Sequence, residues 1–96
     1  MTPTIGRIVH YKLSANDAAR INQNWRSGNE TGNASTEGDI VPLIIVRIWP
    51  DEYGPGVAGV NGQAFLDGHD TLWVTSAREG TEPGQWSWPP RVGGAA

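Results

Sequence analysis

The fold is decided by residues 42–50, which read Pro42-Leu43-Ile44-Ile45-Val46-Arg47-Ile48-Trp49-Pro50. Their β-branched side chains favour a strand, and a proline at each end marks where strand pairing stops. Both faces of the expected strand are apolar, with Leu43, Ile45 and Trp49 on one side and Ile44, Val46 and Ile48 on the other. A strand with two apolar faces is covered on both, so we expect it to be a central strand of the core.

Arg47 interrupts this apolar run. A guanidinium group on a mostly buried strand needs an anionic or carbonyl partner, because an unpaired buried charge is very costly. The sequence leaves two such settings open. Arg47 either faces a ligand pocket or is neutralised by a buried Asp or Glu.

The N-terminal part predicts a strand followed by a helix. Residues 5–13 alternate as a strand whose mostly apolar face points inward and carries Ile5, Arg7, Val9, Tyr11 and Leu13. Ser14 and Asp17 have the spacing of a capping box, which predicts a helix from there to about Arg26. Ala18, Ile21 and Trp25 share one stripe of this helix, so we expect Trp25 to cover the core.

The C-terminal part predicts a hairpin and a short last strand. Residues 60–66 and 71–76 form two strands around a tight reversal at 67–70, with Leu72 and Val74 opposite Trp73. After a second reversal at 80–84, residues 85–88 form a short strand that places Trp86 and Trp88 on one face. Residues 27–39 are expected to be a flexible loop and residues 93–96 a disordered tail, because neither contains a large apolar side chain.

Length and composition place the chain among small β proteins. Its 96 residues are enough for a single globular domain, expected over residues 1–92, and 13 Gly with 7 Pro indicate many turns. We predict a mainly β (α+β) fold, a small five-stranded, partly open SH3-like barrel or roll with one N-terminal helix.

Charge and cysteine content restrict the partners. The net charge of −3 gives no overall basic field, so we do not expect binding to duplex nucleic acid. The chain has no Cys, which excludes disulfides and thiolate metal sites. We see neither a signal peptide nor an apolar run long enough to cross a membrane, so a cytoplasmic protein without a membrane partner is expected.

Aromatic and arginine side chains are the candidate ligand-binding residues. Trp rings stack on nucleobases, and Arg binds phosphate through two hydrogen bonds or stacks on an aromatic ring. The alternative is that the five Trp fill the core, with Trp86 and Trp88 the more exposed of them. The candidates are Tyr11, Arg47, Trp49, Trp73, Arg78, Trp86, Trp88 and Arg91.

Catalytic and metal sites receive less support. Asp67, His69 and Asp70 offer metal ligands within one turn, but a metal site usually draws ligands from more than one segment, so a solvated turn is favoured. His10 acts as a general base only where a nucleophile or substrate pairs with it, and no nucleophile motif is present. We therefore assign no catalytic residue, metal or cofactor, and a small hydrolase acting through His10 is the third choice.

Several strings resemble a widespread family of short proteins encoded by tailed bacteriophages and prophages. The N-terminal strings are Thr4 to Tyr11, Ser14 to Ile21 and Val46 to Trp49. The C-terminal strings are Val60 to Gln63, Phe65 to Gly68, Asp70-Thr71, Trp73, Thr75-Ser76 and Gly84 to Pro89. The resemblance covers most of the chain apart from residues 27–39, 51–59 and the tail. It implies a phage accessory protein that acts in the host cytoplasm.

Two functions from different classes follow. The first is a non-enzymatic, homo-oligomeric binder that sequesters a small nucleotide-type host defence signal, as a sponge, with Trp and Tyr stacking the base and Arg47, Arg78 or Arg91 holding phosphate. The second is an SH3-like protein-interaction or virion-associated module, in which Trp86, Trp88 and the prolines after them dock on a host or phage protein.

Overall fold

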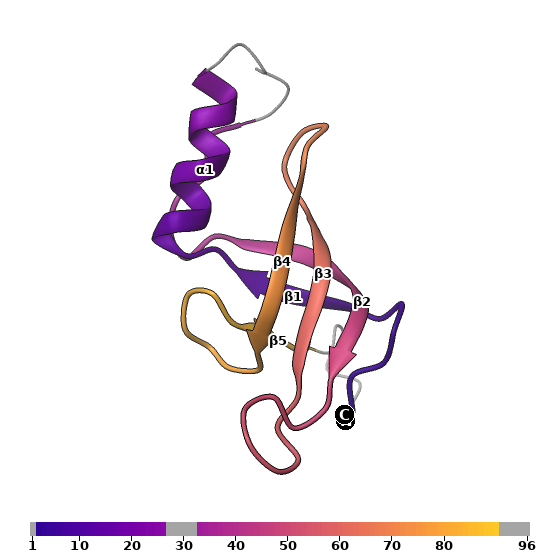
Figure 1. Ribbon diagram of the computed structural model, residues 1–96. Coiled ribbons are helices and arrows are strands. Elements are labelled where there is room, and N and C mark those ends of the chain that lie inside the picture. The colour runs from indigo at the N-terminus through magenta and orange to yellow at the C-terminus, as the bar shows by residue number, and fades with distance from the viewer. Residues whose placement is uncertain (1, 27–32, 91–96) are drawn as a thin grey trace.

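A five-stranded antiparallel sheet and one helix form the fold, as Figure 1 shows. The structure is a computed structural model that describes residues 2–26 and 33–90, without the side chains of residues 24–26. The order of strands across the sheet is β4-β3-β2-β1-β5. The elements are β1 (Ile8–Lys12), α1 (Ala15–Arg26), β2 (Ile40–Trp49), β3 (Gly59–Phe65), β4 (Thr71–Arg78) and β5 (Trp86–Ser87).

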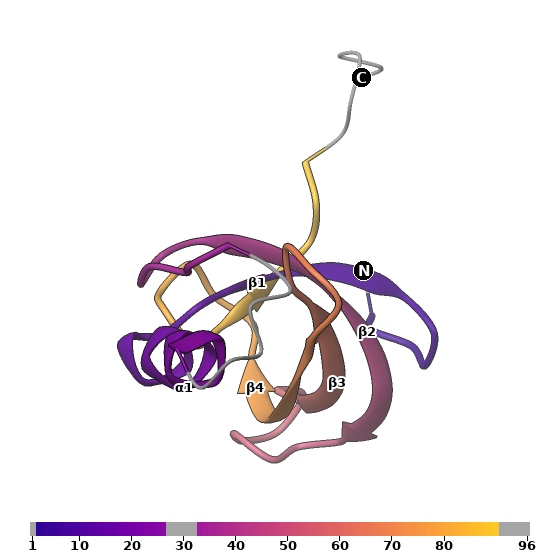
Figure 2. The ribbon, with the colours of Figure 1, turned by 90° about the horizontal axis from the view of Figure 1, so that it is seen from above.

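The predicted fold class is confirmed. The sheet curls into a half-barrel that is consistent with a small open SH3-like barrel. Figure 2 shows β4, β3, β2 and β1 following one another around an arc, with α1 at its open side. The core lies inside this arc and consists of Val9, Tyr11, Leu13, Ile21, Leu43, Ile45, Val60, Ala64, Leu72, Val74, Ala77 and Trp86.

β2 is the middle strand, as its apolar sequence predicts. Its pairing with β1 extends past the expected boundary, because Pro42 lies opposite His10 within the ladder. The N–H of Ile45 donates to the backbone oxygen of Arg7, three positions along the ladder from the pair of Pro42 and His10. Hydrogen-bonded and non-hydrogen-bonded pairs alternate, so Pro42 lies at a position without a bond to β1. Pairing with β3 begins one residue later, at Leu43. Pro42 is therefore tolerated inside the strand, and the prediction that it ends the pairing is wrong.

Only one face of β2 is covered. Leu43 and Ile45 are fully buried, whereas Val46 is 41% exposed on the other side. The expectation of two covered faces is wrong, because α1 and β5 do not extend over the outside of the arc. Antiparallel sheets commonly leave one face open in this way.

Two β-bulges bend the sheet at the same level. On β2 the register shifts between Ile45 and Arg47, so that Val46 is the extra residue. On β4 the register shifts opposite Asn61, where Ser76 has a positive φ of 52°. Bulges bend a strand and increase its right-handed twist. This pair therefore curls the sheet where β2, β3 and β4 lie side by side.

Asn61 on β3 lies between the two bulges and connects them. Its side-chain oxygen accepts hydrogen bonds from the backbone N–H of Ser76, at 2.8 Å, and from Nε1–H of Trp49, at 3.1 Å. Beyond the β2 bulge the alternation is reversed, so Ile48 packs against the core and Trp49 is 39% exposed. The prediction that Trp49 shares a face with Leu43 and Ile45 is wrong for this reason.

The start of α1 follows the predicted capping box. Ser14 Oγ accepts the N–H of Asp17, and Asp17 Oδ2 accepts the N–H of Ser14, both at 3.0 Å. Ala18 and Ile21 are buried, as the helical stripe predicts. The side chain of Trp25, which was expected to cover the core, is not among those that the structure describes.

The segment after α1 is partly described. Residues 27–32 of the expected flexible loop lie outside the described residues, as do Arg91 and the expected tail at 93–96. Within the described part, Ser35 exchanges two hydrogen bonds of 2.8 Å with the side chain of Asn22, and Asn33 Nδ2 donates to Asp67 Oδ2 at 2.7 Å. Among the described residues, no helix has the length and apolar character needed to cross a membrane.

Replacement of Asn61 by Ala tests the connection between the bulges. The Asn61→Ala variant loses two hydrogen bonds and leaves the Ser76 N–H without its acceptor, so we expect a loss of about 1–3 kcal/mol in the free energy of unfolding. Urea unfolding followed by circular dichroism measures this loss. The matched control is Gln63→Ala, the next outward residue of β3, which we expect to change stability by less than about 0.5 kcal/mol. Equal effects of the two variants would contradict the role given to Asn61.

Candidate functional site

The outer face of the sheet carries a group of exposed aromatic rings. Trp49 is 39% exposed, Tyr53 40%, Phe65 43% and Trp73 45%. These four rings and the side chains of Arg47 and Arg78 are called the aromatic–arginine face below. Exposed aromatic side chains in such a group mark a binding surface more often than a structural one.

Two arginines of this face lie over aromatic rings. The guanidinium carbon of Arg47 lies 4.6 Å from the centre of the Trp49 ring, and that of Arg78 lies 5.7 Å from the centre of the Tyr53 ring. Both distances are within the range of cation–π interaction. Each pair presents an aromatic surface and a permanent positive charge side by side.

A hydrogen bond from its polar atom fixes each of the two rings, Trp49 and Tyr53. Trp49 donates its indole N–H to Asn61, and Tyr53 donates its hydroxyl hydrogen to the backbone oxygen of Ser76. Each ring therefore depends on the bulge region, either through Asn61 or through Ser76. A ring that is fixed before binding loses less side-chain entropy when a ligand stacks on it.

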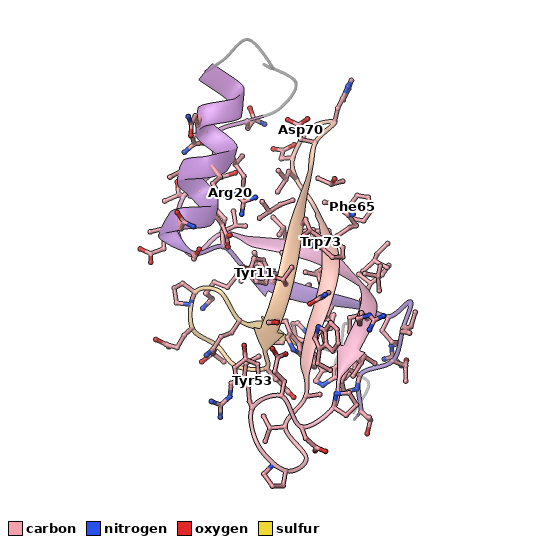
Figure 3. All side chains as sticks on the ribbon, in the orientation of Figure 1. Tyr11, Arg20, Tyr53, Phe65, Asp70 and Trp73 are labelled. Atoms are coloured by element: carbon pink, nitrogen blue, oxygen red, sulfur yellow. The ribbon has the colours of Figure 1, made fainter. Side chains whose placement is uncertain are left out.

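Strand register spaces these groups along the sheet. Thr71 lies opposite Phe65 at one end of β3, Trp73 lies opposite Gln63 in the middle, and both Trp49 and Arg78 lie opposite Gly59 at the other end. Figure 3 shows Phe65, Trp73 and Tyr53 following one another along the β3–β4 hairpin toward the β2–β3 turn. At about 3.3 Å per residue, the six steps from Phe65 to Gly59 span about 20 Å.

Acidic residues are segregated from the strands. The five strands contain three basic residues, Lys12, Arg47 and Arg78, and contain no Asp or Glu. Among the described residues, acidic side chains lie in α1 and in the segments between strands. The carboxylate of Glu52 lies against Gly59 beside Tyr53, and Asp67 and Asp70 lie in the β3–β4 turn. Because Gly59 pairs with Trp49 and Arg78, Glu52 is a carboxylate on the outer face, next to the two arginine–aromatic pairs.

The structure changes the setting of Arg47. Its side chain is exposed, because the extra residue Val46 shifts the alternation of β2 and turns it outward. Of the two settings that the sequence left open, neutralisation of Arg47 by a buried Asp or Glu is wrong, because the side chain is exposed. Its partner is the ring of Trp49.

The remaining predicted site residues lie elsewhere. Trp86 is 1% exposed in the core, so the expectation that it is partly exposed is wrong. Trp88 is half-buried and packs edge-to-face on Trp86, with ring centres 5.3 Å apart, and Arg7 lies over its ring at 5.0 Å. Tyr11 is buried and donates its hydroxyl hydrogen to Asp17 at 2.5 Å. Arg91 lies outside the described residues, so the outer face holds Arg47, Trp49, Trp73 and Arg78 of the predicted set.

A cavity of about 680 Å³ lies where β2 and β4 end and β5 begins, and it shares Arg78 with this face. Among its lining residues are Ile48, Asp51, Arg78, Glu79 and Trp86. Within the described residues, the buried Nε1 of Trp86 has no hydrogen-bond partner. The volume suits a small ligand, but the carboxylates of Asp51 and Glu79 oppose the phosphate of a nucleotide. The outer face suits such a ligand better, because it presents Arg47 and Arg78 beside exposed aromatic rings, with Glu52 as the carboxylate at Gly59.

Sequence reasoning missed two residues of the site. Phe65 alternates with the buried Ala64 of β3 and is exposed, so the period of the strand is the signal that could have found it. Tyr53 lies in the β2–β3 turn, and only the folded chain brings it over Gly59 and beside Arg78.

Comparison with known proteins finds no match to a family model, a curated protein or a solved structure.

Alkaline pH tests the buried pair of Tyr11 and Asp17. Burial, and then the hydrogen bond to Asp17, raise the pKa of Tyr11 well above its ordinary value of 10.0. A phenol whose pKa is raised by folding stabilises the native state fully below its unfolded pKa, and this contribution is lost as the pH rises above about 10. We expect the free energy of unfolding to fall from about pH 10 upward. In Tyr11→Phe, this fall is smaller than in the unaltered chain.

Urea unfolding between about pH 8 and pH 11 measures the effect. Tyr53→Phe is the control, because it removes an exposed phenol. The same fall in Tyr11→Phe as in the unaltered chain would contradict the assignment.

Proposed function

We propose that the protein is a non-enzymatic binding protein that captures a nucleotide-type ligand on the aromatic–arginine face. The observation that carries this proposal is the double pairing of Arg47 with Trp49 on β2 and of Arg78 on β4 with Tyr53 of the β2–β3 turn. A nucleotide offers an aromatic base for the rings and a phosphate for the guanidinium groups.

The chemistry of the face favours binding without turnover. Arginine stays protonated at physiological pH, so Arg47 and Arg78 supply charge and hydrogen bonds and do not transfer protons. Trp and Phe rings supply stacking surface. The side-chain oxygen of Asn61 is already engaged by the N–H groups of Ser76 and Trp49.

The proposed biological role follows from the resemblance to phage accessory proteins. In the host cytoplasm, a protein of this kind would sequester a small nucleotide-type defence signal and leave it chemically intact. A homo-oligomer would place two such faces next to each other and enclose a ligand that one small domain only partly covers.

Titration with AMP and with a cyclic dinucleotide tests the proposal. We expect quenching of tryptophan fluorescence and a stoichiometric complex by native mass spectrometry, because base stacking involves Trp49 directly. Trp49→Ala should weaken binding by about tenfold or more. Release by heat should return the ligand with its mass unchanged, whereas a cleaved ligand would contradict a non-enzymatic role.

Arg47→Ala and Arg7→Ala form a matched pair for the same titration. Both variants remove one positive charge and one stacking contact with a Trp ring. Arg47 lies on the proposed site, whereas Arg7 lies over the half-buried Trp88 beside the core. We expect a loss of affinity in Arg47→Ala alone. Equal losses in both variants would indicate non-specific attraction of an anion.

A protein-docking module is the second candidate, because apolar side chains extend the same face toward β1. Ile8 is 56% exposed and pairs with Ile44, which lies next to Val46. Apolar and aromatic side chains together with Arg are typical of protein interfaces.

A pair of isoleucine variants tests the docking function. We expect a partner protein that binds this face to be retained stoichiometrically by the immobilised chain. Retention should be lost in Ile8→Asp, because a charge then replaces apolar contact area in the interface. Ile5→Asp is the control, since Ile5 is 70% exposed but lies before β1. Equal loss in both variants would contradict docking through the sheet.

A further inference from the structure

The geometry points to single-stranded nucleic acid, several nucleotides long, as the ligand of the aromatic–arginine face. This inference rests on the proposed function and specifies its ligand. It follows from the length of the face, from the position of its charges and from the accessibility of its rings.

The length of the face exceeds one nucleotide. The groups from Phe65 to Trp49 and Arg78 span about 20 Å along β3. Stacked nucleotides of one strand are about 3.4 Å apart, so this distance corresponds to about six stacked bases or to fewer extended ones. Single-strand-binding folds of similar size engage roughly 4–16 nucleotides. A mononucleotide reaches only one end of the face, whereas an oligonucleotide contacts Phe65, Trp73 and Trp49 together.

The positions of the charged groups indicate where a phosphate backbone binds on this face. Arg47 and Arg78 lie toward its Gly59 end, and the strands that form it contain no Asp or Glu. The carboxylate of Glu52 lies at the same end, against Gly59 and beside Tyr53, and Asp67 and Asp70 lie in the β3–β4 turn at the other end. A phosphate backbone is therefore held through Arg47 and Arg78, with bases extending along the rings toward Trp73, and the carboxylates of the β3–β4 turn limit the length of strand that one molecule binds.

Stacking on exposed rings selects single strands over duplexes. In a duplex the faces of the bases are covered by their neighbours, and protein rings reach them only after unstacking. Sheets that bind single strands use exposed aromatic side chains in this way, with little dependence on sequence. The net charge of −3 also disfavours a duplex, whose recognition depends strongly on many phosphate contacts.

Fluorescence anisotropy with labelled oligothymidylates tests the inference on the full chain. Strands of one, two, four, eight and twelve nucleotides are compared with a duplex of the longest. We expect affinity to rise with length up to about six nucleotides and then to level off, with weak duplex binding. Two phosphate contacts predict a slope of about −1.4 for the logarithm of affinity against the logarithm of salt concentration.

Single variants locate the bound strand. Trp49→Ala and Trp73→Ala, which alter one end and the middle of the face, should each weaken binding of the eight-nucleotide strand by about tenfold. Arg47→Ala should reduce the salt slope by about 0.7, whereas Arg7→Ala, with the same change in net charge, should leave affinity and slope unchanged. Circular dichroism and thermal unfolding of each variant confirm that it is folded.

Each result decides between the two proposals. Affinity that rises with length and falls in both Trp variants supports the inference. Binding of a mononucleotide that needs Trp49, with no gain from a longer strand, overturns the inference and leaves the proposed function intact. Absence of binding by mononucleotides and by all strands overturns both. Equal weakening by Arg7→Ala and Arg47→Ala shows non-specific attraction and also overturns the inference.

Discussion

The side chain of Asn61 joins three strands at the point where the sheet bends. Its oxygen holds the N–H of Ser76 on β4 and the indole of Trp49 on β2, so both bulges depend on one carboxamide. These bulges close the arc around the core and at the same time turn Arg47 and Trp49 outward. The curvature of the fold and the exposure of the candidate site therefore have the same physical origin. We expect a change at Asn61 to affect both.

The other end of the fold is fixed by a second polar contact. Asp17 Oδ2 accepts the hydroxyl hydrogen of the buried Tyr11 and the N–H of Ser14, so one carboxylate both caps α1 and joins it to β1. A buried phenol needs such a partner, because burial without a hydrogen bond is costly. Tyr11 is therefore a structural residue. Its place among the candidate ligand-binding residues came from its residue type, which does not distinguish the two roles.

The elements of the fold could be predicted because their signals are local. Ser14 and Asp17 mark the start of α1, and the alternation of Leu72, Trp73 and Val74 marks the buried and exposed sides of β4. The bulge at Val46 has no such signal. An extra residue in an apolar run leaves the pattern apolar. Every side chain after it, however, points to the opposite face of the sheet from the one that simple alternation predicts. This is why Trp49 was expected on the same face as Leu43 and Ile45.

The types of residue in the candidate site could be predicted from the sequence. Which of these residues lie together on one face could not. Arginine and tryptophan side chains suggested a stacking site, but only the strand register shows that Arg47, Trp49, Trp73 and Arg78 share one face while Trp86 fills the core. Net charge was also a poor guide at this scale. A value of −3 describes the whole chain, whereas a ligand within about 10 Å of the sheet responds mainly to nearby groups, because salt screens the more distant ones. Because Arg47 and Arg78 lie over exposed rings of the outer face, an acidic protein can still present positive charge beside aromatic surface, even with the carboxylate of Glu52 at Gly59.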